Sequence, residues 1–354
     1  MSSAQVKYHI IGAGIAGLQT AQLLKRKYPQ AQIIVYEAAE HIGGRCYSFS
    51  DNKLAATLDN ATHAVLRGNT LAAKLLGKNA KFGSAAFYSP QTNKISRKKF
   101  DFINEKALAL FNLPLNKVAQ GVVFKTLSEL FPFTSRQLDV WFSSGDLSSK
   151  LIEPLAQGLD IRLGWKLKGF AAQDDYIYKL IFNKESIALL PQDKIISAVD
   201  AHNFIKIFGG EDFAYNEIIN IFYRTSMQIS LPEGLDFLGL SNMRAQWLFS
   251  SPGILAVTIS DAENLKLSDE ELALSVWKEV CALRGHQSAF LPTYRVLRHK
   301  RATIRQDRRN NALRPTNCRS KWKNMYLAGD WTMKNWPCSI EAALTSAQRI
   351  AKIL

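Results

Sequence analysis

Three glycines near the start of the chain have the spacing of a pyrophosphate-binding turn. Gly12 permits a tight turn, Gly14 lets the backbone approach a pyrophosphate, and Gly17 lets a helix pack closely on a strand. The pyrophosphate would lie on the free N–H groups at the positive end of that helix. Glu37 follows Gly17 by 20 residues, where a carboxylate can accept both ribose hydroxyls of an adenosine. The predicted dinucleotide contacts in this part of the chain are Gly12, Ala13, Gly14, Ile15, Ala16, Gly17, Glu37 and Ala38.

The elements expected around these residues form a βαβ unit. Residues 6–11 are an apolar run typical of a buried parallel strand, and residues 15–27 carry apolar side chains at helical spacing. Residues 33–36 predict the second strand. Further strands are expected at 194–199, 254–259 and 324–327, and further helices at 269–283, after Ser268 as N-cap, and at 339–354. Residues 82–142 contain 11 aromatic residues in 61, and we interpret them as mainly helical with aromatic-rich loops.

Two further motifs distinguish FAD from NAD. Gly43 and Gly44 let the chain pass close to a cofactor, and Arg45 supplies a fixed positive charge to its diphosphate. The segment resembles the GGR-x-x-S motif of flavin oxidoreductases similar to amine oxidases and polyene desaturases. Gly329 and Asp330 resemble the second FAD motif of that superfamily, in which the aspartate accepts a hydrogen bond from the ribityl chain. The helix that starts near Ile340 would direct its N-terminus at the flavin, so Ile340 completes the predicted FAD contacts.

These motifs predict an α/β fold. It consists of a glutathione-reductase-like FAD-binding Rossmann domain interleaved with a mixed α+β substrate domain. We expect the FAD-binding domain to comprise residues 1–75, 185–210 and 320–354. Residues 76–184 and 211–319 would form the substrate-binding or capping domain.

Several segments resemble one family within that superfamily, hydroxysqualene dehydroxylase. They are Leu58-Asp59-Asn60-Ala61-Thr62-His63, Glu153-Pro154-Leu155-Ala156, Ala245-Gln246-Trp247-Leu248-Phe249, Lys300-Arg301-Ala302-Thr303 and Leu327-Ala328-Gly329-Asp330-Trp331-Thr332 with Trp336-Pro337 and Ile340-Glu341. The resemblance runs in order over nearly the whole chain and is thin between residues 80 and 150. The chain departs from the family pattern at Ala61, Thr62, Asp160, Ala342 and Ala347.

The resemblance implies that hydroxysqualene loses its allylic hydroxyl and receives hydride from reduced FAD, which gives squalene for hopanoid synthesis. The substrate would be a long apolar isoprenoid, and the aromatic residues at 82–142 suit an apolar tunnel whose ring faces stabilise a carbocation. His63 and Asn60, in the LDNxxH-like segment, are the predicted catalytic residues, with His63 as the proton donor.

Three other functions remain open. A carotenoid- or phytoene-type desaturase would run the same flavin chemistry oxidatively on a similar substrate. A flavin amine oxidase usually carries a tyrosine just before the closing helix, and residues 335–339 lack one. A flavoprotein without turnover is supported by Ala342 and Ala347, which replace glycines of the family.

The net charge of +15 predicts anionic partners, and the densest basic stretch is residues 295–323. No nucleic-acid motif accompanies it, so nucleic acid is not expected, whereas peripheral contact with an anionic membrane is. The chain shows no signal peptide and no apolar run of about 20 residues. Its four cysteines form no CxxC pair, so we expect a cytoplasmic protein without a metal site, peripheral on the inner face of the membrane. No separate NAD(P)H motif is present, which leaves the electron donor unknown.

Overall fold

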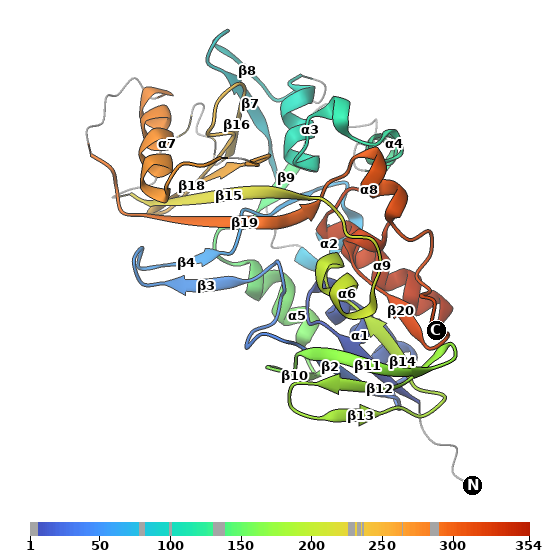
Figure 1. Cartoon of the computed structure of the whole chain (residues 1–354). Helices are drawn as coiled ribbons and strands as arrows, with labels where there is room; N and C mark the ends of the chain where they lie inside the picture. Colours follow the sequence, from blue (N-terminus) through green and yellow to red (C-terminus); the bar gives the residue numbers. More distant parts are fainter. Residues whose placement is uncertain are drawn as a thin grey trace.

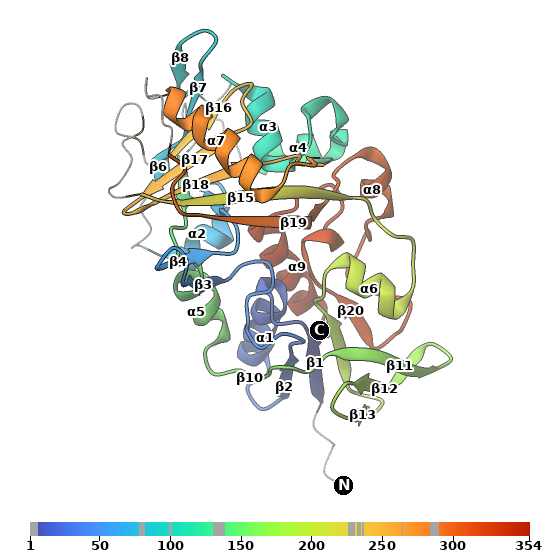
Figure 2. The same cartoon turned by 60° about the vertical axis from the view of Figure 1, so that its left-hand side comes forward.

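The computed structural model describes residues 6–77, 82–98, 101–129, 139–225, 231, 235, 237–263, 265–283 and 290–354. These residues form two regions, each built on a large sheet, which lie one above the other in Figures 1 and 2. Within the described ranges, no helix combines the length and the apolar character that crossing a membrane requires.

The lower region contains a parallel sheet of five described strands in the order β10-β2-β1-β14-β20. Its strands are β1 (Lys7–Ile11), β2 (Gln32–Tyr36), β10 (Asp160–Arg162), β14 (Lys194–Ser197) and β20 (Met325–Leu327). One face packs on α1 and α9, and the other packs on α6 and a small antiparallel sheet. These elements are α1 (Ile15–Lys27), α9 (Ile340–Ile353), α6 (Ala201–Phe208), β11 (Leu167–Gln173), β12 (Tyr176–Phe182) and β13 (Ser186–Ala188).

Alternation along the strands explains the three layers. Ile10 and Val35 belong to the core shared with α1 and α9, whereas their neighbours Ile11 and Ile34 belong to the core on the opposite face. Because both faces are covered, the strands are apolar at nearly every position, as parallel strands usually are. The predicted Rossmann fold is therefore confirmed.

The upper region contains a mixed sheet of seven described strands, β19-β15-β18-β17-β16-β7-β8. The strands are β19 (Tyr294–Ile304), β15 (Tyr215–Arg224), β18 (Ile254–Ile259), β17 (Trp247–Ser251), β16 (Phe237–Leu240), β7 (Ala86–Ser89) and β8 (Lys94–Ser96). Helix α7 (Asp269–Leu283) packs on one face, and Ser268 and Glu271 form the capping box at its start. The opposite face carries aromatic and polar side chains and faces the lower region.

Shorter elements join the two regions. They are β3 (Ser48–Asp51), β4 (Ala56–Asp59), β5 (Ala64–Leu66), α2 (Thr70–Leu76), β6 (Gly83–Ser84), α3 (Ile103–Phe111), η1 (Leu115–Lys117), α4 (Gln120–Glu129), β9 (Asp139–Phe142), η2 (Ser148–Ile152), α5 (Glu153–Ala156), α8 (Arg308–Leu313) and η4 (Asp330–Thr332). Figure 2 shows α3 and α4 beside the upper sheet and α9 beneath it.

The interpretation of residues 82–142 as mainly helical is only partly right for the described part. Strands β6, β7, β8 and β9 lie there together with α3 and α4. Strand β7 pairs with β16, about 150 residues further along the chain. The pairing of β7 with β16 has no local sequence signal, whereas the turn at residues 90–93, which joins β7 to β8 in a hairpin, was not recognised. Residues 99–100 and 130–138 of this stretch lie outside the described residues.

The division between the regions also differs from the expected one in two places. Strand β10 pairs with β2 in the parallel sheet, and β11 and β12 pack on the same sheet, although residues 76–184 were assigned to the substrate domain. In the other direction, Leu54 and Leu58 around the β3–β4 turn pack on Phe222 of the upper sheet. Both segments are short and reach across from the neighbouring region, so composition gives no sign of their location.

Candidate active site

The glycine motif has the close backbone contacts that a bound pyrophosphate requires. Gly12 has a φ of +105°, and a Cβ on Gly17 would lie 2.0 Å from the carbonyl oxygen of Gly12. The Gly43 N–H donates to the Ala13 carbonyl over 2.9 Å, so the second glycine motif lies directly on the first. A Cβ on Gly44 would lie 3.3 Å from the Gly14 Cα. The first motif, the second motif and the start of α1 therefore form one surface without side chains that fits a dinucleotide.

Glu37 is oriented by the backbone around it. One carboxylate oxygen accepts from the Ala13 N–H and the other from the Ala39 N–H, each over 2.8 Å. Both Glu37 and Ala38 line the cavity described below. The remaining lone pairs of this carboxylate can accept two neighbouring hydroxyls, which matches its predicted contact with ribose.

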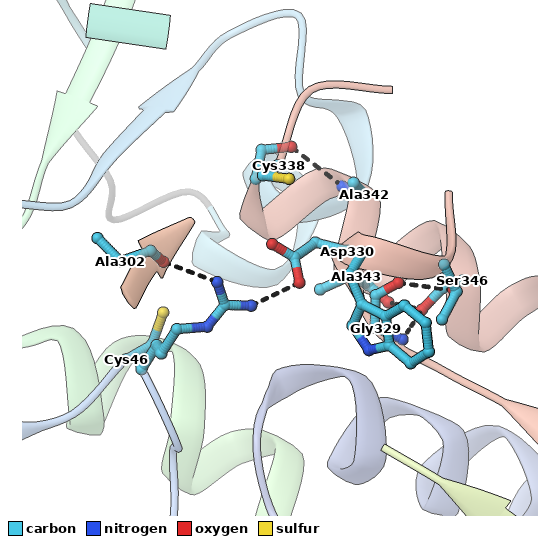
Figure 3. A network of polar contacts seen from close by, with 12 residues as sticks. Cys46, Ala302, Gly329, Asp330, Cys338, Ala342, Ala343 and Ser346 are labelled. Carbon is cyan, nitrogen blue, oxygen red and sulfur yellow. Dashed lines mark hydrogen bonds and ion pairs between the residues drawn. The ribbon is translucent and has the colours of Figure 1, made fainter. Parts of the chain in front are cut away.

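Arg45 connects the N-terminal and C-terminal motifs. Its guanidinium donates to an Asp330 carboxylate oxygen over 2.5 Å and to the Ala302 carbonyl over 2.9 Å. Figure 3 labels both acceptor residues and marks these contacts with dashed lines. The Asp330 charge raises the pKa of Arg45 above its usual range. Arg45 and Asp330 therefore meet at one point, from segments 285 residues apart. Arg45 therefore forms an ion pair with Asp330 and can also face the diphosphate of a bound cofactor.

The C-terminal motif is fixed by a residue that the sequence analysis did not single out for a role. Arg314, only 2% exposed, donates to the carbonyl oxygens of Asp330, Trp331 and Trp336 over 2.6, 3.2 and 2.6 Å. Its planar guanidinium can bond several acceptors at once. Arg314 thereby holds the segment between the Gly329–Asp330 turn and α9. Nothing in the sequence distinguishes Arg314 from the other arginines of the basic stretch, so its burial could not be predicted.

Other arginines of the basic stretch 295–323, from which we expected attraction to anionic partners, are also paired within the protein. Arg295 pairs with Asp51, Arg298 with Asp269, and Arg305 with Glu263. Arg295 and Arg298 lie on β19 and Arg305 directly follows it, and each lies beside an acidic residue from another segment. Much of this positive charge is therefore neutralised within the protein.

The start of α9 is well ordered by capping. Ser339 accepts from the Ala342 N–H, and Ser346 accepts from the Gly329 N–H over 2.8 Å. Ala342 and Ala347 are fully buried, and neither belongs to the described cavity lining, which α9 meets through Ile340 and Ala343. The methyl groups that replace family glycines therefore pack in the interior and do not crowd a bound flavin. This removes the observation that supported a flavoprotein without turnover.

Asn60 and His63 have local partners. The Asn60 side chain accepts from the Tyr47 N–H and donates to the Arg45 carbonyl, so it fixes the loop that carries the second glycine motif. The two His63 ring nitrogens lie 3.3 Å from Asn60 Oδ1 and 3.8 Å from Cys46 Sγ. Burial lowers the pKa of His63 to about 4, so its ring is neutral at pH 7. Both residues line the cavity, but these contacts are structural, and a catalytic role for either stays a prediction.

A single cavity of about 660 Å³ joins the cofactor motifs to the upper sheet. At one end it is lined by Gly12, Gly14, Glu37, Gly44, Arg45, Gly329, Asp330 and Ile340. At the other end it is lined by Leu110, Phe87, Phe142, Phe237, Trp247 and Phe249. The rings pack on one another, with centroids 4.1 Å apart for Phe142 and Phe237 and 5.2 Å apart for Phe87 and Trp247. Of these aromatic residues, only Phe87 and Phe142 fall in the range 82–142 that the sequence indicated; the others lie on β16 and β17.

The fold and the glycine surface define a dinucleotide-binding protein of the Rossmann type. A model of the NAD(P)-binding Rossmann-like domain matches residues 10–78, and a model of the flavin-containing amine oxidoreductases matches residues 91–354. The chain therefore belongs to the flavin-containing amine oxidoreductase family. A flavin bound by a dinucleotide fold is FAD, so the predicted cofactor and the predicted class of oxidoreductase are confirmed.

Comparison with individual proteins agrees with this assignment. The chain is 28% identical to the hydroxysqualene dehydroxylase of Sinorhizobium fredii, over 98% of this chain and 97% of the relative. It is 27% identical to the enzyme of the same name from Rhodopseudomonas palustris, over 98% and 97% of the two chains. An oxidoreductase from Methanosarcina mazei has a similar fold, with a TM-score of 0.71 and 14% identity over 98% of this chain and all of that one.

Proposed function

We propose that this enzyme reduces hydroxysqualene to squalene. The supporting observation is the cavity, which runs from the FAD motifs to an aromatic wall without a break. Two relatives that match over nearly the whole length of both chains are named after that reaction. In the overall change, a hydride replaces the hydroxyl group, which leaves as water after taking up one proton. Bound reduced FAD would supply the hydride.

The chain's own residues would bind the cofactor, orient the substrate and exclude water. The glycine surface and Glu37 would hold the dinucleotide, and Asp330, fixed by Arg45 and Arg314, would meet the ribityl chain. The rings of Phe142, Phe237 and their neighbours would surround an apolar chain. Their faces carry negative electrostatic potential, which favours a cationic carbon, and the apolar rings exclude water from it.

The test is formation of squalene from hydroxysqualene by the FAD-bound enzyme after anaerobic photoreduction. We expect squalene in proportion to the enzyme and reoxidation of the flavin on addition of the substrate. A desaturase acting on phytoene is the second candidate, because the same cavity suits a long polyene. Flavin that stays reduced with hydroxysqualene, while oxidised enzyme dehydrogenates phytoene, would replace the first proposal by the second.

We also propose that the protein docks on anionic membranes through α3 and α4. Phe124 and Leu127 on α4 are 78% and 45% exposed, and Ile103 on α3 is 48% exposed. Lys117 lies exposed just before α4. Apolar side chains beside cations are typical of helices that lie in a membrane interface. Helix α3 also contributes Ala109 and Leu110 to the cavity lining, so a docked protein would hold its cavity close to the lipid.

Sedimentation with phosphatidylglycerol vesicles at low salt tests this docking. We expect the double variant Phe124→Ser, Leu127→Ser to stay in solution while the wild-type protein sediments. Leu190→Ser is the matched control, because Leu190 is 46% exposed but lies before β14 in the lower region. Equal sedimentation of the double variant and the control would exclude docking through α4.

A further inference from the structure

A small polar cluster interrupts the apolar side of the cavity. Thr62 and Thr258 both line the cavity, and their hydroxyl oxygens are 2.7 Å apart. The Thr258 hydroxyl donates to the Asn220 side-chain oxygen over 2.8 Å, and the Thr62 backbone N–H meets the same oxygen over 3.3 Å. Because a backbone N–H can only donate, this contact fixes the orientation of the Asn220 amide.

The number of protons in the cluster shows which kind of group it can still bind. Each threonine hydroxyl has one proton to donate. Both hydroxyls lie within hydrogen-bond distance of the Asn220 oxygen, Thr258 at 2.8 Å and Thr62 at 3.1 Å, so one donates to Asn220 and the other donates to the same oxygen or across the 2.7 Å contact between the hydroxyls. Both protons are then used, and the Thr62 oxygen presents only lone pairs to the cavity. The cluster can therefore bind a group that donates a hydrogen bond.

The position of the cluster on the sheet adds a second constraint. Asn220, Thr258 and Trp247 are register partners on β15, β18 and β17, and the same row continues through Gly239 to Phe87 on β7. Residues in register across strands point to the same face of a sheet. The row is thus polar at β15 and aromatic from β17 to β7. It matches a molecule with a hydroxyl at one place and an apolar chain beyond it.

Asn220 also has an unusual feature. The residue is completely buried, and among the described residues its side-chain N–H₂ group meets no acceptor. Burial of an unpaired amide donor lowers stability, and an aliphatic side chain here would avoid that loss. Its retention fits a role for the Asn220 oxygen in orienting the two threonines.

From this geometry we propose that Thr62, Thr258 and Asn220 form the binding site for the hydroxyl group of an isoprenoid alcohol. The Thr62 oxygen accepts the alcohol proton, Thr258 and Asn220 orient Thr62, and the apolar chain extends along Trp247 and Phe87. The assignment deepens the proposed function, on which it rests for the identity of the alcohol. It concerns binding and orientation, and Thr62 is in contact with the substrate, whereas Asn220 is a positioning residue.

The experiment compares an alcohol with the hydrocarbon that lacks its hydroxyl. Binding of hydroxysqualene and of squalene to the oxidised FAD enzyme is measured by the change in flavin absorbance. We expect Thr62→Val to weaken hydroxysqualene binding about tenfold and to leave squalene binding unchanged. Thr62→Ser keeps the hydroxyl and should bind as the wild-type protein does. Thr126→Val removes a buried threonine hydroxyl that bonds only within α4 in the described structure, and it is the matched control.

Each outcome decides the proposal. If Thr62→Val weakens the binding of squalene and of hydroxysqualene equally, Thr62 has only a packing role and the proposal is overturned. The proposal is also overturned if the variant binds both ligands as tightly as the wild-type protein does. Farnesol and farnesene provide the same comparison independently of the proposed reaction. If the wild-type enzyme forms no squalene but Thr62→Val selectively weakens farnesol binding, the alcohol site stands and the proposed function fails. Loss of folding is recognised from the flavin spectrum, and Thr258→Val then serves as the second variant.

Discussion

The lower and upper sheets differ in how their site residues are distributed along the sequence. In the parallel sheet, the residues that meet the cofactor come in short contiguous runs at the ends of β1 and β2 and after β20. In the upper sheet, the strands from β7 to β15 that line the cavity contribute one or two residues each, and the edge strand β19 contributes four. A cofactor common to many enzymes is thus bound by local motifs. The substrate is met by a surface that exists only after distant strands pair.

The largest expected effect is on the lower region. Gly17→Ala places a methyl group 2.0 Å from the Gly12 carbonyl oxygen. The backbone at the two positions cannot move apart without opening the turn. We expect the variant to lose FAD, measured as the ratio of absorbance at about 450 nm to that of the protein, and with it all turnover. Gly169→Ala, in the same region with no atom within 4 Å of the added methyl, is the control. A yellow, active Gly17→Ala protein would show that the glycine contacts are not needed.

Arg314 holds the segment that carries Asp330, and its removal should affect both stability and cofactor binding. Arg314→Met leaves three buried carbonyl oxygens without their donor, which should lower the free energy of unfolding by about 3 kcal/mol or more and weaken FAD binding. Denaturant unfolding and FAD titration measure the two effects. Arg308→Met, an exposed arginine on the adjacent helix α8, should change neither. Unchanged FAD affinity in Arg314→Met would mean that these hydrogen bonds are not needed to position Asp330 for the cofactor.

Gly239→Ala addresses the upper region alone. The added methyl would lie 2.6 Å from the buried ring of Phe87 and 3.1 Å from Trp247. Such overpacking costs about 1–3 kcal/mol and displaces the aromatic row. We expect an unchanged flavin spectrum and weaker substrate binding. Gly83→Ala is the control that should change neither, because the added methyl meets nothing within 4 Å. Loss of FAD from Gly239→Ala would contradict the division of labour between the sheets.

The smallest effect is on pH dependence. Burial lowers the pKa of His9 in the lower region and of His63 on the cavity to about 4, from about 6.5 when unfolded. As the pH falls below 6.5, the unfolded chain takes up a proton that the folded chain does not, so stability falls. Between pH 7.5 and 5.5, each histidine should account for about 1 kcal/mol of this loss. We expect His9→Gln to remove its share in unfolding measurements. A smaller share for His63→Gln would indicate that water enters the cavity, whereas no change for His9→Gln would contradict the buried environment.

The sequence predicted the lower region well because its signals are local. Gly12, Gly17 and Glu37 fall within one βαβ unit, and their spacing follows from the geometry of that unit. Arg45 and Asp330 could be recognised by resemblance, but their direct contact depends on the folded chain. The same limit explains why β10 was assigned to the wrong region, since three residues that pair with β2 carry no distinguishing pattern.

The upper region was predicted less well for the corresponding reason. Trp247 was noted only as part of a family segment, and Asn220 and Thr258 were not noted at all. Their relation depends on the register of β15, β17 and β18. Thr62 was marked as a departure from the family pattern, and the structure gives that departure a meaning by placing its hydroxyl beside Thr258.

The packing of α9 on α1 also has a consequence for biosynthesis. The first helix of the cofactor region meets the last one, and Lys27 donates to the Ala351 carbonyl over 3.0 Å. A ribosome makes all of the upper sheet before it makes β20 and α9, which complete the parallel sheet and its helical layer. The growing chain therefore carries an aromatic surface before it can retain FAD. During synthesis, chaperones or lipid can therefore contact that surface until β20 and α9 emerge. The bound cofactor then connects the N-terminal glycine motif with the C-terminal motif.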